Sequence, residues 1–189
     1  MRYEYKKEGN KYVTPICSAP GNDGIHDVSQ FVSAVGMLEE ALATWDSPKL
    51  FHVTLANATA TDYSQFITRM KVKLKGISMA YKLATEIDAF KGHHQHWMVV
   101  VDTTNPEALF GTDNDSSAIS KVTKVIRREA PDFRVLVAQP YKHPSTPYIP
   151  LTAATLDDAV DWFSYALKSR SKPDGPCYSS SRAARRTYH

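Results

Sequence analysis

The sequence has no long apolar run and only two cysteines, and both absences narrow the class of protein. No stretch of about 18 apolar residues occurs among the 189 residues, so no membrane-spanning helix is predicted. Residues 1–12 have no apolar core of the kind that a secretory signal needs. Cys17 and Cys177 are too far apart to form a metal-binding or redox motif. These absences predict a cytoplasmic protein in a reducing, intracellular setting.

The sequence also lacks a Gly-x-x-x-x-Gly-Lys motif, which excludes a fused P-loop helicase. Its net charge of +3 is weak support for a nucleic-acid partner, but the charge is unevenly distributed. Lys168–His189 contains six lysine or arginine residues and one aspartate, so this stretch carries +5 and the remainder −2. A basic tail on a near-neutral body suits contact with phosphates, although a solvated tail without a partner has the same composition.

Hydrophobic periodicity predicts four helices and four main strands. The helices cover 27–45, 62–74, 116–128 and 155–168, and the strands cover 51–56, 79–87, 94–101 and 133–138. From residue 51 the order is strand, helix, strand, strand, helix, strand, helix. This order is typical of an α+β, ferredoxin-like (split βαβ) antiparallel sheet, here with an added C-terminal helix. We expect helices on one face of the sheet and an open second face.

The same pattern divides the chain into three parts. Residues 1–50 form an N-terminal extension with one helix, residues 51–170 form the main domain, and residues 171–189 form the basic tail.

Histidines begin the third predicted strand. Strand alternation places His94 and His96 on one face, roughly 6–7 Å apart, where two imidazoles can bind one divalent ion. A third ligand would come from the neighbouring strand, with Glu86 the first candidate and Asp88 the second. Such a set of two nitrogens and one oxygen suits Mn²⁺, Mg²⁺ or Zn²⁺. A histidine-rich hairpin without metal is the structural alternative.

The last predicted helix is amphipathic. Val160, Phe163 and Leu167 centre its apolar stripe, and Tyr165 lies on the opposite face beside Lys168, one turn later. A phenol next to an ammonium can act as a nucleophile. An ordinary surface tyrosine on an amphipathic helix would show the same pattern.

Taken together, the two signals resemble the HUH endonuclease superfamily, which includes rolling-circle replication initiators of plasmids, single-stranded DNA viruses and filamentous phages. The resemblance covers roughly residues 50–170. Its elements are the strand Phe51–Ala56, the two histidines of His94-Gln95-His96 and the Tyr-x-x-Lys run Tyr165-Ala166-Leu167-Lys168. Gln95 stands where the family usually has a bulky apolar residue, and in a shifted register His93 would take part in the site.

The resemblance implies a mechanism. A divalent ion, Mn²⁺ or Mg²⁺, would be held by His94, His96 and Glu86 and would polarise the scissile phosphate. Tyr165 would attack the phosphorus, leaving a 5′-phosphotyrosine link and a free 3′-hydroxyl, while Lys168 would stabilise the phosphate or position the tyrosine. Since positions 161 and 169 are not tyrosine, the enzyme would use a single tyrosine.

The implied partners are single-stranded DNA at a replication origin and a host polymerase and helicase. The candidate DNA-binding residues are the basic ones of the C-terminal stretch: Arg170, Lys172, Arg182, Arg185 and Arg186. If Tyr165 were not the nucleophile, Tyr141 and Tyr148 would be the next candidates.

Two other functions compete with this interpretation. His52-Val53-Thr54 resembles half of a 2H phosphoesterase, which opens cyclic phosphates with two His-x-Thr/Ser motifs, and His143-Pro144-Ser145 would be the second half. The other alternative is a non-catalytic ferredoxin-like module that binds single strands, although such sheets usually expose aromatic side chains for stacking.

Overall fold

A computed structural model describes residues 6–8, 11–13, 25–26, 28–88, 92–111, 116–168, 172 and 177–181. The helices are α1 (Val28–Thr44), α2 (Ala60–Lys73), α3 (Glu107–Phe110), α4 (Ala118–Ile126) and α5 (Leu156–Ser164), and the 3-10 helix η1 (Tyr165–Leu167) follows α5. The strands are β1 (Lys6–Glu8), β2 (Lys11–Val13), β3 (Ile25–His26), β4 (Pro48–Ala56), β5 (Met79–Asp88), β6 (Gly92–Asp102), β7 (Arg134–Val137), β8 (Ile149–Pro150) and β9 (Tyr178–Ser180). The predicted class, helices combined with an antiparallel sheet, is confirmed.

The main sheet has the strand order β7-β4-β6-β5-β9, and β8 also pairs with β4. All of these pairs are antiparallel. β6 lies between β4 and β5, so side chains from three strands meet on each face near the middle of the sheet. β1, β2 and β3 form a separate small sheet that the sequence pattern did not predict.

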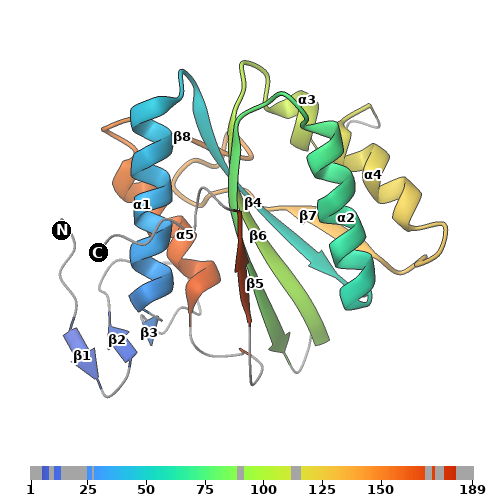
Figure 1. The fold of residues 1–189 in the computed structure, drawn as a ribbon, viewed down its shortest axis with the longest axis horizontal. Helices are drawn as coiled ribbons and strands as arrows, with labels where there is room; N and C mark the ends of the chain where they lie inside the picture. Colours follow the sequence, from blue (N-terminus) through green and yellow to red (C-terminus); the bar gives the residue numbers. More distant parts are fainter. Residues whose placement is uncertain are drawn as a thin grey trace.

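Helices cover both faces of the main sheet (Figure 1). The hydrophobic core on one side joins α2 and α4 to Trp97, Val99 and Val101 of β6. The core on the other side joins α1 and α5 to Met98 and Val100 of the same strand. The expectation of helices on one face and an open second face is therefore wrong. The run Trp97–Val101 of β6 is apolar at every position, which fits burial on both faces.

Helix α2 begins at a capping box. The Thr59 hydroxyl accepts a hydrogen bond from the Asp62 amide at 3.2 Å, and the Asp62 carboxylate accepts one from the Thr59 amide at 2.9 Å. Two otherwise unpaired backbone donors are satisfied in this way, which fixes the start of the helix just before the predicted position.

The C-terminal helix ends earlier than predicted. The α-helical hydrogen bonding stops at Ser164, and Tyr165 begins the 3-10 turn rather than lying within an α-helix that runs to Lys168. Two side chains satisfy carbonyls at this helix end: Lys172 donates to Ala166 at 3.0 Å and Tyr178 donates to Leu167 at 3.2 Å. The periodicity of the sequence reports only local geometry, so it could not predict these bonds between residues of different elements.

Among the described helices, none has both the length and the apolar character needed to cross a lipid bilayer.

Candidate metal centre

A buried group of one glutamate and two histidines lies on the face of the sheet that α1 and α5 cover. Glu86 on β5 pairs directly with His94 on β6, and His96 follows two positions later on the same face. One ligand atom of each residue lies within 4.8 Å of the other two. The three residues are only 1–3% exposed. The ligand set expected from the sequence is thus assembled in the structure and could hold a metal ion.

The distances within this group are close to those of a coordinated ion. His94 Nε2 lies 3.6 Å and His96 Nε2 lies 3.5 Å from Glu86 Oε2. Two ligand atoms that bind one ion at about 2.1 Å lie roughly 3.0–3.4 Å apart at tetrahedral or octahedral angles. The two distances from the histidines to the carboxylate thus exceed those of a coordinated ion by only a few tenths of an ångström, and all three ligand atoms lie within 4.8 Å of one another.

A backbone contact orients His94. Its Nδ1 lies 3.1 Å from the carbonyl oxygen of Gly92 at the start of β6. Because a carbonyl oxygen only accepts hydrogen bonds, Nδ1 carries a proton and Nε2 is the ring nitrogen that faces Glu86. Nε2 donates to the carboxylate when it is protonated, and in the neutral ring it carries the lone pair. This is the tautomer that binds a metal ion through Nε2.

His96 is oriented by a third histidine. His52 Nε2 lies 2.8 Å from His96 Nδ1, and the Thr54 hydroxyl lies 3.3 Å from the same atom. If His96 donates through Nδ1 to these groups, its Nε2 is free to bind a metal. That Nε2 is buried and has no hydrogen-bond partner among the described residues. Burial lowers the pKa of His96 even though Glu86 raises it, so the imidazole is neutral at pH 7.

Two lysines contact the carboxylate of Glu86. Lys168 Nζ lies 3.2 Å from Oε2, and Lys172 Nζ lies 2.6 Å from Oε1. Burial alone would raise the pKa of Glu86, but its contacts with His94, His96 and Lys172 outweigh this effect and hold the pKa well below its usual range. The glutamate is therefore ionised and available as a ligand across the neutral pH range.

Tyr165 lies against the same group. Its ring centroid is 5.6 Å from that of His96 and 5.9 Å from that of His52. Lys168 Nζ lies 4.0 Å from the centroid of the Tyr165 ring. The end of α5 and the turn η1 thus bring a partly exposed phenol, an ammonium and the three candidate ligands to one place on the sheet.

The other residues singled out in the sequence lie elsewhere or outside the described part. His93 points to the opposite face, where its ring stacks on Tyr63 with centroids 5.6 Å apart, so the unshifted register holds. Lys172, expected to contact DNA, lies against Glu86. The side chain of Asp88 is not among those described. The remaining candidates for DNA contact lie outside the described residues: Arg170, Arg182, Arg185 and Arg186.

The contact of His52 with His96 was not predicted from the sequence. There, His52 belongs only to a His-x-Thr motif that suggests a 2H phosphoesterase. Alternation along β4 was the available signal, because it puts His52 and Thr54 on the same face as the histidine pair once β4 and β6 are adjacent. That adjacency follows from the sheet order and not from any local pattern.

A second polar cluster fixes α5 to the loop before β8. The hydroxyl of Tyr141 donates a short hydrogen bond to the buried carboxylate of Asp161. Lys142 lies 3.1 Å from Asp161 and 2.8 Å from Asp158, and His143 lies 3.1 Å from Asp158. These contacts hold the helix that leads to Tyr165.

Removing the Tyr141 hydroxyl is expected to destabilise the protein. Tyr141→Phe leaves a buried carboxylate with one donor fewer, which costs about 1–3 kcal/mol. In a chain of this size the loss lowers the melting temperature by about 2–4 °C per kcal/mol, measurable by thermal denaturation. Tyr148→Phe is the matched control, since that ring packs on Phe51. An equal loss of stability in both variants would contradict the assigned role of the hydroxyl.

The ion pair between Asp158 and Lys142 predicts a dependence of stability on acid pH. The hydrogen bond from Lys142, aided by His143, lowers the pKa of Asp158 below its ordinary value of 3.8. Its stabilising contribution is therefore present above that pH and is lost as the pH falls through the folded-state pKa. Asp158→Asn should be less stable than wild type at pH 7, by less than about 1 kcal/mol because the pair is partly exposed, and equally stable near pH 2. Melting temperatures that differ equally at both pH values would contradict this assignment.

The chain was compared with protein-family models, with curated proteins and with solved structures. None of the three comparisons gives a match. The centre is therefore identified from its own side chains and their geometry alone.

Proposed function

We propose that the protein is a metal-dependent endonuclease of the HUH type, which nicks single-stranded DNA through a covalent link to Tyr165. The observation that carries this proposal is the convergence of two groups that are distant in sequence. The ring of Tyr165 lies 5.6 Å from that of His96, which belongs to the candidate metal-binding group with Glu86 and His94. A nucleophile and a Lewis-acid site on adjacent elements are what phosphodiester transfer requires.

The sheet order supports the same proposal. β4, α2 and β5 follow one another in the chain, and β6 is inserted between the two strands. This arrangement supports our assignment of the domain to a ferredoxin-like fold, whose split βαβ unit also has a strand inserted between two others. The histidine strand β6 is then central, with Glu86 on one neighbouring strand and His52 on the other.

The candidate centre would hold Mn²⁺ or Mg²⁺ through Glu86, His94 and His96. When bound, the ion supplies a Lewis acid that polarises the scissile phosphate. The unpartnered Nε2 of His96 and the ionised carboxylate of Glu86 fit such an ion. Imidazoles and carboxylates bind several metals, so the ligands alone do not select one. We choose a hard divalent cation because the proposed role is that of a Lewis acid on a phosphate.

Tyr165 is the proposed nucleophile. Its oxygen forms a bond to phosphorus, the bond from phosphorus to the 3′-oxygen breaks, and the proton lost by the phenol is balanced by one gained by the 3′-oxygen. The products are a 5′-phosphotyrosine and a free 3′-hydroxyl that can prime a host polymerase. Lys168, 4.0 Å from the ring centroid, places positive charge where the phosphate would approach. Transfer between esters conserves the bond energy, so rejoining needs no nucleotide.

The 2H phosphoesterase alternative has less support. It needs His52 and a second histidine on a shared substrate, but His52 is engaged by His96 and His143 is held against Asp158 of α5. The non-catalytic alternative is separated by experiment, because it predicts binding of single strands without cleavage.

The proposal is tested by incubating the purified protein with a pool of labelled single-stranded oligonucleotides and Mn²⁺, followed by a denaturing gel. We expect a labelled band that migrates with the protein and disappears when a chelator replaces the metal. If the oligonucleotides bind but form no adduct with either Mn²⁺ or Mg²⁺, the result would favour the non-catalytic module and overturn the proposal.

His52 is expected to be a positioning residue for the metal site. Replacing His52 with alanine removes the closest partner of His96 Nδ1 and leaves the ligand free to change its tautomer. Loss of such an outer partner lowers metal affinity by about 10- to 100-fold. Mn²⁺ titration followed by electron paramagnetic resonance measures this effect, and His143→Ala is the control. Unchanged Mn²⁺ affinity in His52→Ala would contradict the role.

A further inference from the structure

The outer surface formed by α2 and α4 is strongly basic. Residues 60–75 contain four lysine or arginine residues and one aspartate, and residues 116–128 contain four with no acidic residue. These two segments carry +7 in a chain whose net charge is +3, so the rest of the chain is net acidic. Both helices pack on the face of the sheet opposite the candidate metal centre (Figure 1). The nuclease proposal therefore assigns no role to this charge.

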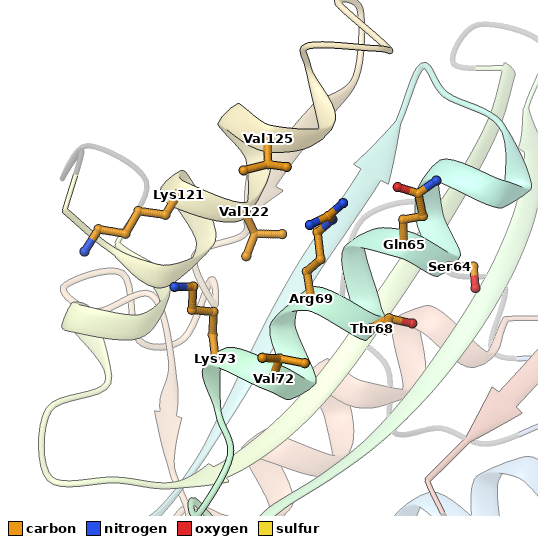
Figure 2. Close-up of a pocket in the computed structure, with 9 residues that line it drawn as sticks. All are labelled: Ser64, Gln65, Thr68, Arg69, Val72, Lys73, Lys121, Val122 and Val125. Atoms are coloured by element: carbon orange, nitrogen blue, oxygen red, sulfur yellow. The ribbon is translucent and has the colours of Figure 1, made fainter.

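A hollow of about 580 Å³ lies between the two helices. Its lining combines three valines, three cations and three neutral polar residues: Val72, Val122, Val125, Arg69, Lys73, Lys121, Ser64, Gln65 and Thr68. Val72 is 69% exposed, the most exposed of the large hydrophobic residues described. Figure 2 shows Arg69 and Lys73 extending from α2 toward α4 and Val122 pointing back toward α2. Among the described residues, no carboxylate forms an ion pair with Arg69, Lys73 or Lys121.

We propose that this hollow binds an acidic amphipathic helix of a partner protein. Exposed Val72 and half-buried Val125 would receive the apolar face of the helix above buried Val122, and the cations would pair with carboxylates along its edges. The 14 residues of α2 correspond to a length of about 21 Å, so a partner helix of similar length would fill the groove. A nucleic-acid backbone would satisfy the cations but would leave exposed Val72 without an apolar partner.

The test uses a labelled 14-residue helical peptide with leucine at helical positions i, i+3, i+4 and i+7, glutamate at positions that flank this stripe and alanine elsewhere, with binding measured by fluorescence anisotropy. A scrambled peptide of the same composition controls for general attraction, and a 14-base-pair duplex is the nucleic-acid probe. We expect the amphipathic peptide to bind more tightly than the scrambled peptide and the duplex, with an affinity that falls as salt increases.

Three variants separate the charged and apolar contributions. The double variant Arg69→Glu with Lys121→Glu should weaken peptide binding by about tenfold or more, and Val72→Gln by about threefold without any change of charge. Lys71→Glu with Lys75→Glu is the matched control, because it makes the same change of charge at two exposed lysines that do not line the hollow, and Lys71 Nζ lies 5.0 Å from the centroid of the Tyr81 ring. Circular dichroism and thermal denaturation check that each exposed substitution leaves the fold intact.

Several results would overturn the proposal. Equal affinity for the two peptides, or an equal effect of the control variant and the Arg69/Lys121 double variant, would reduce the surface to a general attraction for acidic molecules. The surface would instead be a nucleic-acid site if the duplex bound more tightly than the amphipathic peptide, and if the Arg69/Lys121 double variant but not Val72→Gln weakened that binding. Concentration-dependent self-association that Val72→Gln abolishes would assign the hollow to a second copy of the chain. Nicking activity is measured in parallel, so a failure here is distinct from a failure of the nuclease proposal.

Discussion

Replacing Tyr165 with phenylalanine is expected to abolish formation of the covalent adduct with single-stranded DNA. The substitution removes only the oxygen that would attack phosphorus and keeps the ring in its contacts with His52, His96 and Lys168. Loss of a covalent nucleophile lowers the rate by at least about 10³-fold. The measurement is the fraction of labelled oligonucleotide retained with the protein on a denaturing gel, at fixed Mn²⁺ concentration and time.

Tyr141→Phe and Tyr148→Phe are the controls for this result. Both change a phenol elsewhere in the chain, and Tyr141 donates its hydrogen bond to Asp161 rather than facing the histidines. Each should retain adduct formation at a temperature where it is folded. An adduct that persists in Tyr165→Phe but is lost in one of the controls would move the nucleophile. Mn²⁺ affinity should remain at the wild-type value in Tyr165→Phe, because the phenol is not one of the proposed ligands.

Replacing either histidine of the centre with glutamine is expected to lower Mn²⁺ affinity by about 100-fold or more. His94→Gln and His96→Gln each remove one of the three donors that lie within 4.8 Å of one another. Two remaining protein ligands hold a divalent ion weakly, since the chelate loses one anchoring bond. Isothermal titration calorimetry with Mn²⁺ measures the affinity, and adduct formation should fall in parallel.

His93→Gln is the matched control for the two ligand substitutions. It makes the same change on the same strand, but the His93 ring stacks on Tyr63 on the opposite face of the sheet. Its Mn²⁺ affinity should equal that of wild type. A loss of Mn²⁺ binding in His93→Gln as large as that in His94→Gln would mean that the ligands are other than those proposed. Thermal denaturation of all three variants distinguishes a lost site from a lost fold.

The core of the centre could be predicted from sequence because it depends on short-range regularities. Alternation along a strand places His94 and His96 on one face, and a tight hairpin places Glu86 opposite His94. The proximity of Lys168 to Tyr165 likewise involves residues only three apart in the chain, although a 3-10 turn takes the place of the predicted α-helix there. These features need no knowledge of which elements pack together.

Other features depend on packing between distant elements and could not be predicted from the sequence. The apolar run Trp97–Val101 fits a strand buried on both faces, whereas the expectation of an open face depends on the order of helices and strands alone. Strand β9 and the contact of Lys172 with Glu86 arise from residues that read as a basic tail. The pairing of His52 with His96 needs β4 and β6 to be neighbours, a tertiary property.

The lysines beside Glu86 make metal loading an exchange reaction. The carboxylate already has two resident counter-ions, Lys168 and Lys172, so the metal-free protein contains no uncompensated buried anion there. A divalent ion bound at Oε2 would compete with the ammonium of Lys168, and its apparent affinity would include the free energy of releasing that group. Lys172 also holds the carbonyl of Ala166, the residue after Tyr165. Because both histidine Nε2 atoms face Oε2, Lys168 is the ammonium that an ion there would displace, and Lys172 would keep its bonds to Oε1 and to that carbonyl. The cation released is thus the one that lies over the ring of Tyr165.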